Sequence, residues 1–236
     1  MKNFTTLIKE SFEIYKKKIK LILLILLICW IMVIVLAGLL GGGMFFSALQ
    51  LENKEALGIT NFLLLLLISI GIFLIMGLWT AFINLVFAIL AIKPAEVKLK
   101  EVFQESWRNL LEYFWIILLT GFFVLLSTLF LIIPGIIVGI YLILCPYVFV
   151  IEGEKGINAL KRSWNLIKGN WWKVFGRTIL LNGFFGIIFF ALGSINDLLS
   201  SVFQLFSLPF YAIFLYLIYL ELKKSKEIQA PTPIQV

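Results

Sequence analysis

Six long apolar runs recur along this 236-residue chain, at residues 19–40, 59–92, 113–133, 135–151, 174–193 and 202–222. A helix of about 20 residues is long enough to cross the roughly 30 Å hydrocarbon core of a bilayer. The chain is 62% apolar and 14% charged, with a mean hydropathy of +1.07, far from the balance of soluble domains. We therefore predict an all-α integral membrane protein, with one polytopic domain over residues 1–228 and a disordered tail over 229–236.

The run at 59–92 is the one whose number of crossings is ambiguous. As a single helix it would be about 51 Å long, yet it is short for two spans and a turn. Taken as one span, it places every lysine and arginine except Lys54 on one side of the membrane, in the N-terminus, in the segments around 93–112 and 152–173, and in the tail. Two spans would scatter the basic residues, against the positive-inside rule. We expect six transmembrane helices with both termini in the cytoplasm.

Three segments form an internal repeat that aligns on Ser11, Ser106 and Ser163. Apolar residues lie four and three positions before each serine and one and four positions after it. They are Leu7, Ile8, Phe12 and Tyr15; Val102, Phe103, Trp107 and Leu110; and Ala159, Leu160, Trp164 and Ile167. This spacing gives a helix one apolar face. Because each segment leads into a span, the pattern predicts cytoplasmic amphipathic helices in the headgroup plane.

Tryptophans and basic residues gather in these segments and predict a lipid interface. Its candidate residues are Trp107, Lys161, Arg162, Ser163, Trp164, Lys168, Gly169, Trp171 and Trp172. One interpretation is that the segments only anchor and orient the bundle, since indole favours the interface. The other is that they grip anionic phospholipid headgroups, which attract basic residues by roughly 1 kcal/mol each. The net charge of +7 does not point to nucleic acid, because the basic residues flank apolar runs.

The chain from Pro134 onward resembles a known family. The matching positions include Pro134 and Gly135, where we expect a tight turn between the third and fourth spans. The others are Pro146, Glu152, Gly153, Ser163, Trp164, Gly169 and Trp172. Over these positions the chain resembles the membrane domain of glycerophosphoryl diester phosphodiesterases and related stand-alone membrane proteins of bacteria and archaea. The resemblance implies a multi-helix module of the plasma membrane that has no catalytic residues of its own. In the fused enzymes hydrolysis belongs to a separate soluble barrel with histidine and carboxylates around a metal, and this chain has no histidine.

Two of the matched residues also have a direct physical interpretation. Pro146 lacks a backbone donor and is expected to kink the fourth span, with neighbouring groups satisfying the freed carbonyl. Glu152 is expected at the cytoplasmic end of that span, where it caps the helix or pairs with Lys155, Lys161 or Arg162 in a solvated interfacial pair.

The sequence offers little chemistry for catalysis. Without histidine, and with Cys29 and Cys145 inside separate apolar runs, we expect neither a metal site, nor a cofactor, nor a disulfide. No complete SxxK, GxSxG or P-loop motif is correctly placed. No charge lies near a span centre, which argues against an ion-coupled carrier. Gly38 with Gly42 and Gly135 with Gly139 have GxxxG spacing, which fits either packing within the bundle or a homo-oligomer.

Three functional hypotheses follow. The leading one is a non-enzymatic membrane protein that organises or senses lipid at the cytoplasmic leaflet, with anionic phospholipids as partners. A homo-oligomer or an unknown membrane partner is a further partner hypothesis. The alternative is a permease or exporter component for lipid-like or peptide substrates, because glycine and proline interrupt the fourth and fifth spans. An enzyme that acts on lipid ranks third.

Overall fold

A computed structural model describes residues 3–51 and 59–229, with side chains described for 3–31, 66, 67 and 69–228. The described chain is helical throughout and contains no strand. Five of its helical segments are long and apolar enough to cross a membrane: Ser69–Ile92, Leu110–Phe130, Ile132–Glu152, Trp171–Gly193 and Asp197–Ile228. The chain is therefore an all-α, multi-pass membrane protein. The predicted tail at 229–236 lies outside the described residues except for Gln229, which ends the last helix.

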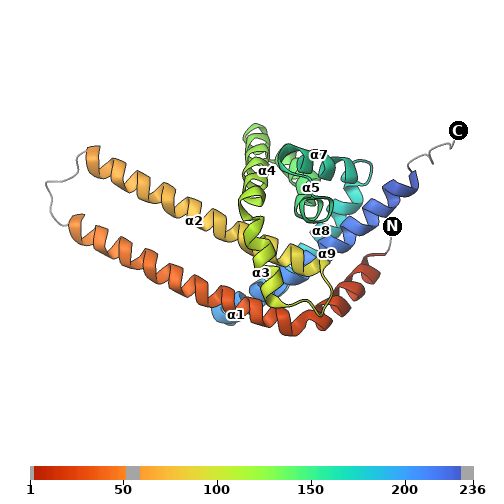
Figure 1. Cartoon of the computed structure of the whole chain (residues 1–236), viewed down its shortest axis with the longest axis horizontal. Helices are drawn as coiled ribbons and strands as arrows, with labels where there is room; N and C mark the ends of the chain where they lie inside the picture. Colours follow the sequence, from red (N-terminus) through yellow and green to blue (C-terminus); the bar gives the residue numbers. More distant parts are fainter. Residues whose placement is uncertain (1–2, 52–58, 230–236) are drawn as a thin grey trace.

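The first two helices form a long hairpin that projects to the left of Figure 1. Helix α1 covers Phe4–Leu51, so the first repeat segment and the predicted span 19–40 belong to one continuous helix. The side chains of the second half of that span, and Lys54, lie outside the described residues. Helix α2 covers Ile59–Ile92 without interruption, which confirms that the ambiguous run forms one helix.

A short helix and a helical hairpin follow. Helix α3 (Leu99–Arg108) meets α4 (Leu110–Phe130) at Asn109, and the chain then reverses into α5 (Ile132–Leu142). The reversal occurs at Leu131, which is extended with φ −165° and ψ 148°, and not at Pro134 and Gly135 as the sequence predicted. Pro134 lies in the first turn of α5, where a helix tolerates proline because the missing N–H needs no partner.

The fourth apolar run is a broken helix. Helix α5 ends at Leu142, a short α6 covers Cys145–Tyr147 around Pro146, and a π-helix, η1, covers Val148–Glu152. Gly153 ends it in the left-handed conformation, with φ 72°, which glycine adopts without steric cost.

The chain then folds back as α7 (Gly156–Ile167), turns at Gly169 with φ 89°, and continues as α8 (Trp171–Gly193) and α9 (Asp197–Gln229). The side chain of Asn196 accepts a hydrogen bond from the Leu198 N–H at 2.7 Å and so caps α9. The N-terminal end of α1 and the C-terminal end of α9 lie on the same side of the molecule (Figure 1).

The core lies where α1, α2 and α9 meet the broken helix. Its largest fully buried side chains include Tyr219, Phe214, Leu85 and Leu144. At its edge the buried ammonium group of Lys18 donates to the carbonyls of Leu90, Ala91 and Lys93 at 2.6, 3.1 and 2.5 Å. These carbonyls lie at the C-terminal end of α2, where the helix dipole favours a cation. Lys18 therefore joins α1 to the end of α2.

Candidate functional site

The three serines of the repeat all lie on buried faces. Ser11, Ser106 and Ser163 are each 0% exposed, and the residues four positions before them, Leu7, Val102 and Ala159, are at most 1% exposed. The aromatic residues that follow the serines are turned outward instead, with Phe12 49%, Trp107 73% and Trp164 37% exposed. Each repeat helix thus packs its serine face against the protein itself and offers an aromatic edge to its surroundings.

Helix α7 packs on the break in the fourth run, and Ser163 explains how. A helix continuing through Cys145 would donate that residue's N–H to the Tyr141 carbonyl, but the break removes this bond. The Ser163 hydroxyl donates to the Tyr141 carbonyl at 2.7 Å in its place. The rings of Tyr141 and Trp164 stack with centroids 3.8 Å apart. A residue of the repeat therefore satisfies a carbonyl that the interruption leaves without its helical donor.

A polar cluster around Glu152 ties α7 to α9. Its carboxylate accepts hydrogen bonds from Arg162 Nε at 2.6 Å and from the Tyr219 hydroxyl at 2.7 Å, and Lys223 Nζ lies 3.7 Å away. The hydrogen bond to Glu152 raises the pKa of the Arg162 guanidinium. The Glu152 side chain is only 12% exposed, so the pair is less solvated than the sequence predicted.

The other predicted partners of Glu152 lie elsewhere. Lys155 pairs with Glu112 at the start of α4, at 2.7 Å. Lys161 is exposed and lines a cavity of about 500 Å³ with Phe123, Ser127, Ile157 and Trp164. Sequence reasoning missed Tyr219 and Lys223, although their i, i+4 spacing at the polar end of the last run was a usable signal.

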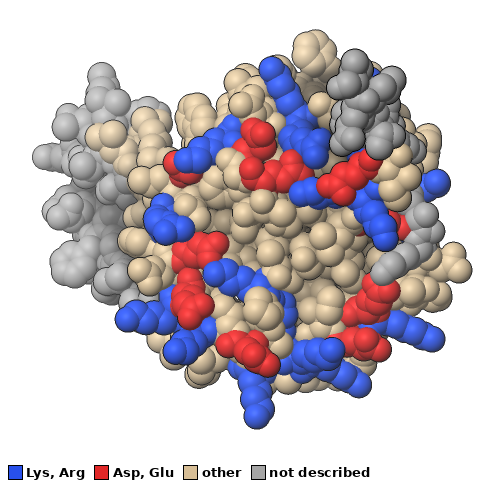
Figure 2. Space-filling view, turned by 45° about the vertical axis from the view of Figure 1, so that its right-hand side comes forward, with Lys and Arg blue, Asp and Glu red and all other residues tan. Residues whose placement is uncertain are grey.

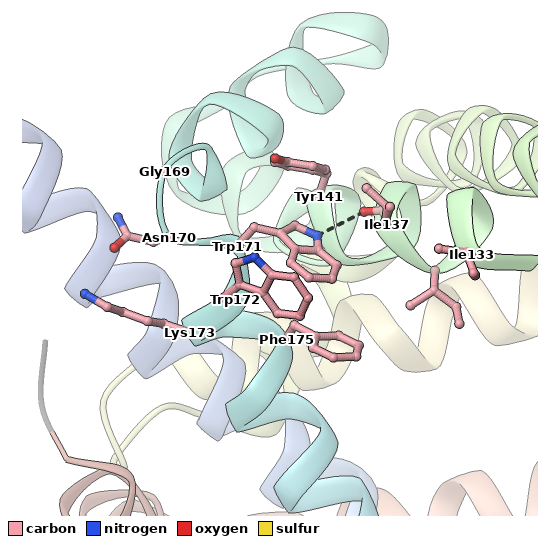
Figure 3. Close-up of a pocket in the computed structure, with 10 residues that line it drawn as sticks. Ile133, Ile137, Tyr141, Gly169, Asn170, Trp171, Trp172, Lys173 and Phe175 are labelled. Carbon is pink, nitrogen blue, oxygen red and sulfur yellow. Dashed lines mark hydrogen bonds between the residues drawn. The ribbon is translucent and has the colours of Figure 1, made fainter.

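A cavity of about 780 Å³ lies between α5 and the start of α8. Its walls are aliphatic and aromatic: Ile133, Ile136, Ile137, Tyr141, Trp171, Trp172 and Phe175. Trp171 Nε1 donates to the Ile137 carbonyl at 3.3 Å, which fixes one wall (Figure 3). Asn170 and Lys173 lie at one side of the cavity and Ile133 at the opposite side (Figure 3). The cavity thus has a polar side and an apolar side.

Three lysines lie on α7, at its end and at the start of α8, and one of them, Lys173, lines this cavity. Among the described residues, Lys161, Lys168 and Lys173 form no ion pair with a carboxylate, and the side chains of all three are exposed. The backbone carbonyl of Lys168 accepts a hydrogen bond from Lys226 Nζ at 3.0 Å, which holds the end of α7 against α9. Over the face drawn in Figure 2, basic and acidic side chains are interspersed around a central area with few charges.

The predicted interface residues do not form one site. Lys161 to Trp172 lie together on α7 and the start of α8, around the cavities just described. Trp107 lies on α3 against Phe82, with ring centroids 6.2 Å apart, and lines a separate apolar cavity with Cys29 and Trp79. Gly135 belongs to the α4–α5 contact, where an added Cβ would lie 3.2 Å from the Thr128 Cα atom.

Metal chemistry finds no support in the part of the chain that the structure describes. No three histidine, cysteine, aspartate or glutamate residues are placed there to hold an ion. Both cysteines are buried and unpaired with each other.

The comparisons with known proteins give a family match. A family model described as a domain of unknown function (DUF7847) matches residues 116–220, fewer than half of the chain. The match runs from α4 into α9 and includes Glu152, Arg162, the Trp171 cavity and Tyr219, but not α1, α2 or α3. No curated protein and no solved structure matches the chain. The chain is thus similar to DUF7847 over the segment that carries the candidate site.

Proposed function

We propose that this chain is a non-enzymatic membrane protein that binds anionic phospholipid at the cytoplasmic leaflet and so organises or senses lipid there. The observation that carries the proposal is the 780 Å³ cavity, whose walls are apolar and aromatic and whose polar side holds Asn170 and Lys173. An acyl chain fits the walls through the hydrophobic effect, and a phosphate fits the side that holds Lys173.

The proposal includes a topology of six spans with cytoplasmic termini. It is supported by the five helices long enough to cross, by the unbroken α2, and by the two helix ends on one side of the molecule. In this arrangement α3 and α7 are cytoplasmic interfacial helices held mainly by their buried serine faces. Their aromatic edges, Trp107 and Trp164, reach the headgroups. The resemblance to the phosphodiesterase membrane domain is kept as part of the proposal, without its hydrolytic activity.

The test compares two triple variants of equal net charge. Lys161, Lys168 and Lys173 are replaced by glutamine in one variant, and Lys98, Lys100 and Lys224 in the other. We measure the preference for spin-labelled phosphatidylglycerol over phosphatidylcholine by electron spin resonance in reconstituted membranes. At roughly 1 kcal/mol for each lysine, the first variant is expected to lose most of the preference, and the second to keep it. Equal preference in the two variants would overturn the proposal.

A permease or exporter component remains the second candidate function, and one specific observation favours it. The fourth span is broken at Leu142, and discontinuous membrane helices commonly line binding sites in transporters.

A further inference from the structure

We propose that a second cavity, between α2, the break before α6, and α9, binds a small uncharged solute through hydrogen bonds. The cavity measures about 370 Å³ and shares no lining residue with the Trp171 cavity. Thr80 and Asn84 of α2, Ile143 and Pro146 at the break, and Tyr211 of α9 line it. The inference therefore stands apart from the lipid-binding proposal.

The break leaves a backbone acceptor at Ile143, a residue that lines this cavity. In a continuous helix the Ile143 carbonyl would accept the N–H of Tyr147, but that N–H donates to Leu144 at 3.1 Å. None of the hydrogen bonds described for this chain is donated to the Ile143 carbonyl. An unpaired carbonyl within a membrane is tolerated where it lines a hydrated or occupied cavity, and Ile143 lines this one.

Two side chains of α2 add further hydrogen-bonding capacity. Thr80 Oγ1 donates to the Met76 carbonyl and Asn84 Nδ2 to the Thr80 carbonyl, each at 2.8 Å. These bonds leave the threonine oxygen as an acceptor, and they leave Asn84 with one N–H donor and its carbonyl oxygen. Asn84 lies about 12 Å along the helix from Ile92, where hydrocarbon offers an amide no partner.

The residues that line the cavity indicate the class of ligand. No lysine, arginine, aspartate or glutamate is among the described residues that line the cavity, so an ion would have no countercharge. An acyl chain would leave the Ile143 carbonyl, the acceptor capacity of Thr80 and the remaining amide groups of Asn84 without partners. Apolar side chains such as Ile83, Leu208 and Leu215 form the remaining wall. A polyol of about three to six carbons offers donors, acceptors and a carbon skeleton for such a site.

The test measures whether the cavity is wet and whether a polyol occupies it. In the full chain, with Cys29→Ala and Cys145→Ala, a single cysteine is introduced as Asn84→Cys, or independently as Thr80→Cys. After reconstitution, its reaction with a small water-soluble methanethiosulfonate is followed by mass spectrometry. Phe122→Cys, on the exposed face in the middle of α4, is the control for a lipid-facing position. Lys224→Cys, at the exposed end of α9, is the control for water.

We expect position 84 or 80 to react at least tenfold faster than position 122, because thiol modification needs water. Glycerol or xylitol should slow that reaction at least twofold more than it slows the reaction at position 224. The comparison with position 224 corrects for the viscosity of the polyol solution. Sodium gluconate should not slow the reaction in this way. Reactivity at positions 84 and 80 as low as at 122, or a rate that neither polyol slows, would overturn the proposal. Stronger protection by gluconate would overturn the uncharged class.

Discussion

Ser11, Ser106 and Ser163 occupy one position of the repeat, yet their hydroxyls have different partners. Ser163 satisfies the Tyr141 carbonyl, Ser106 donates to Val102 in its own helix at 2.7 Å, and the buried Ser11 hydroxyl has no hydrogen-bond partner. We expect Ser163→Ala to lower the unfolding free energy by about 1–3 kcal/mol, because it leaves a buried acceptor unpaired. Ser106→Ala should cost less, and Ser11→Ala should be neutral or stabilising. Unfolding in detergent micelles ranks the three; equal losses would contradict the assignment.

Tryptophan exposure gives a second prediction at this scale. Trp172 is 77% exposed, whereas Trp164 is 37% exposed and stacked on Tyr141. We compare two variants, one with Trp164 and one with Trp172 as its single remaining tryptophan. Lipids brominated near the headgroup should quench the fluorescence of Trp172 more than that of Trp164. Quenching of Trp172 chiefly by lipids brominated at the chain end would contradict its interfacial position.

Between elements, the α4–α5 hairpin depends on one glycine of the GxxxG pair. A Cβ on Gly135 would lie 3.0 Å from the Thr128 Cβ, while a Cβ on Gly139 would meet nothing within 4 Å. Gly135→Ala should therefore force the helices apart and cost about 1–3 kcal/mol. Gly139→Ala is the matched control and should stabilise by roughly 0.5–1 kcal/mol, because alanine favours helix. Thermal unfolding of the two variants separates them, and similar shifts would show that Gly135 is not a contact point.

Lys18, which binds the carbonyls at the end of α2, should make the unfolding free energy depend on pH. Burial lowers the pKa of Lys18 to about 8, below the ordinary value of about 10.4. Between these values the unfolded chain binds more protons than the folded chain at this site, so the contribution of Lys18 to stability rises with pH. Relative to Lys18→Met, the intact chain should gain unfolding free energy from pH 8 to pH 10. A difference that stays constant or falls would contradict this sign.

The elements differ in how far the sequence could predict them. The length of the apolar run and the positive-inside rule were enough to predict α2 as one helix. Both depend on the membrane and not on neighbouring helices. The serine repeat also located three helical segments. Their packing could not be predicted, since the amphipathic pattern is the same whether the apolar face meets lipid or protein. The link from Ser163 to Tyr141 depends on the break at Leu142, and the cluster of Glu152 with Tyr219 depends on α9 lying beside α7.

For the whole molecule, the proposed topology can be tested at both surfaces. Lys98 and Lys161 are separated by two crossings, and so are Lys161 and Lys224, so all three are expected on the cytoplasmic side. Leu131 and Ile195, which are 66% and 76% exposed at the two intervening turns, are expected outside. Single cysteines at these positions, with Cys29 and Cys145 replaced, are probed with an impermeant thiol reagent.

Labelling from outside should occur at 131 and 195 only. Labelling at the two turns tests two separate pairs of spans. Residue 131 lies between α4 and the broken helix, and residue 195 lies between α8 and α9. Labelling at 195 but not at 131 would mean that the first pair stays within the cytoplasmic half of the bilayer, which would reduce the crossings from six to four. That outcome would also move the break at Leu142, and the cavity beside it, toward the headgroups, where an unpaired carbonyl costs less. Labelling at 131 instead keeps the six crossings, with the break lying beneath α7, where Ser163 and an occupied cavity satisfy the backbone.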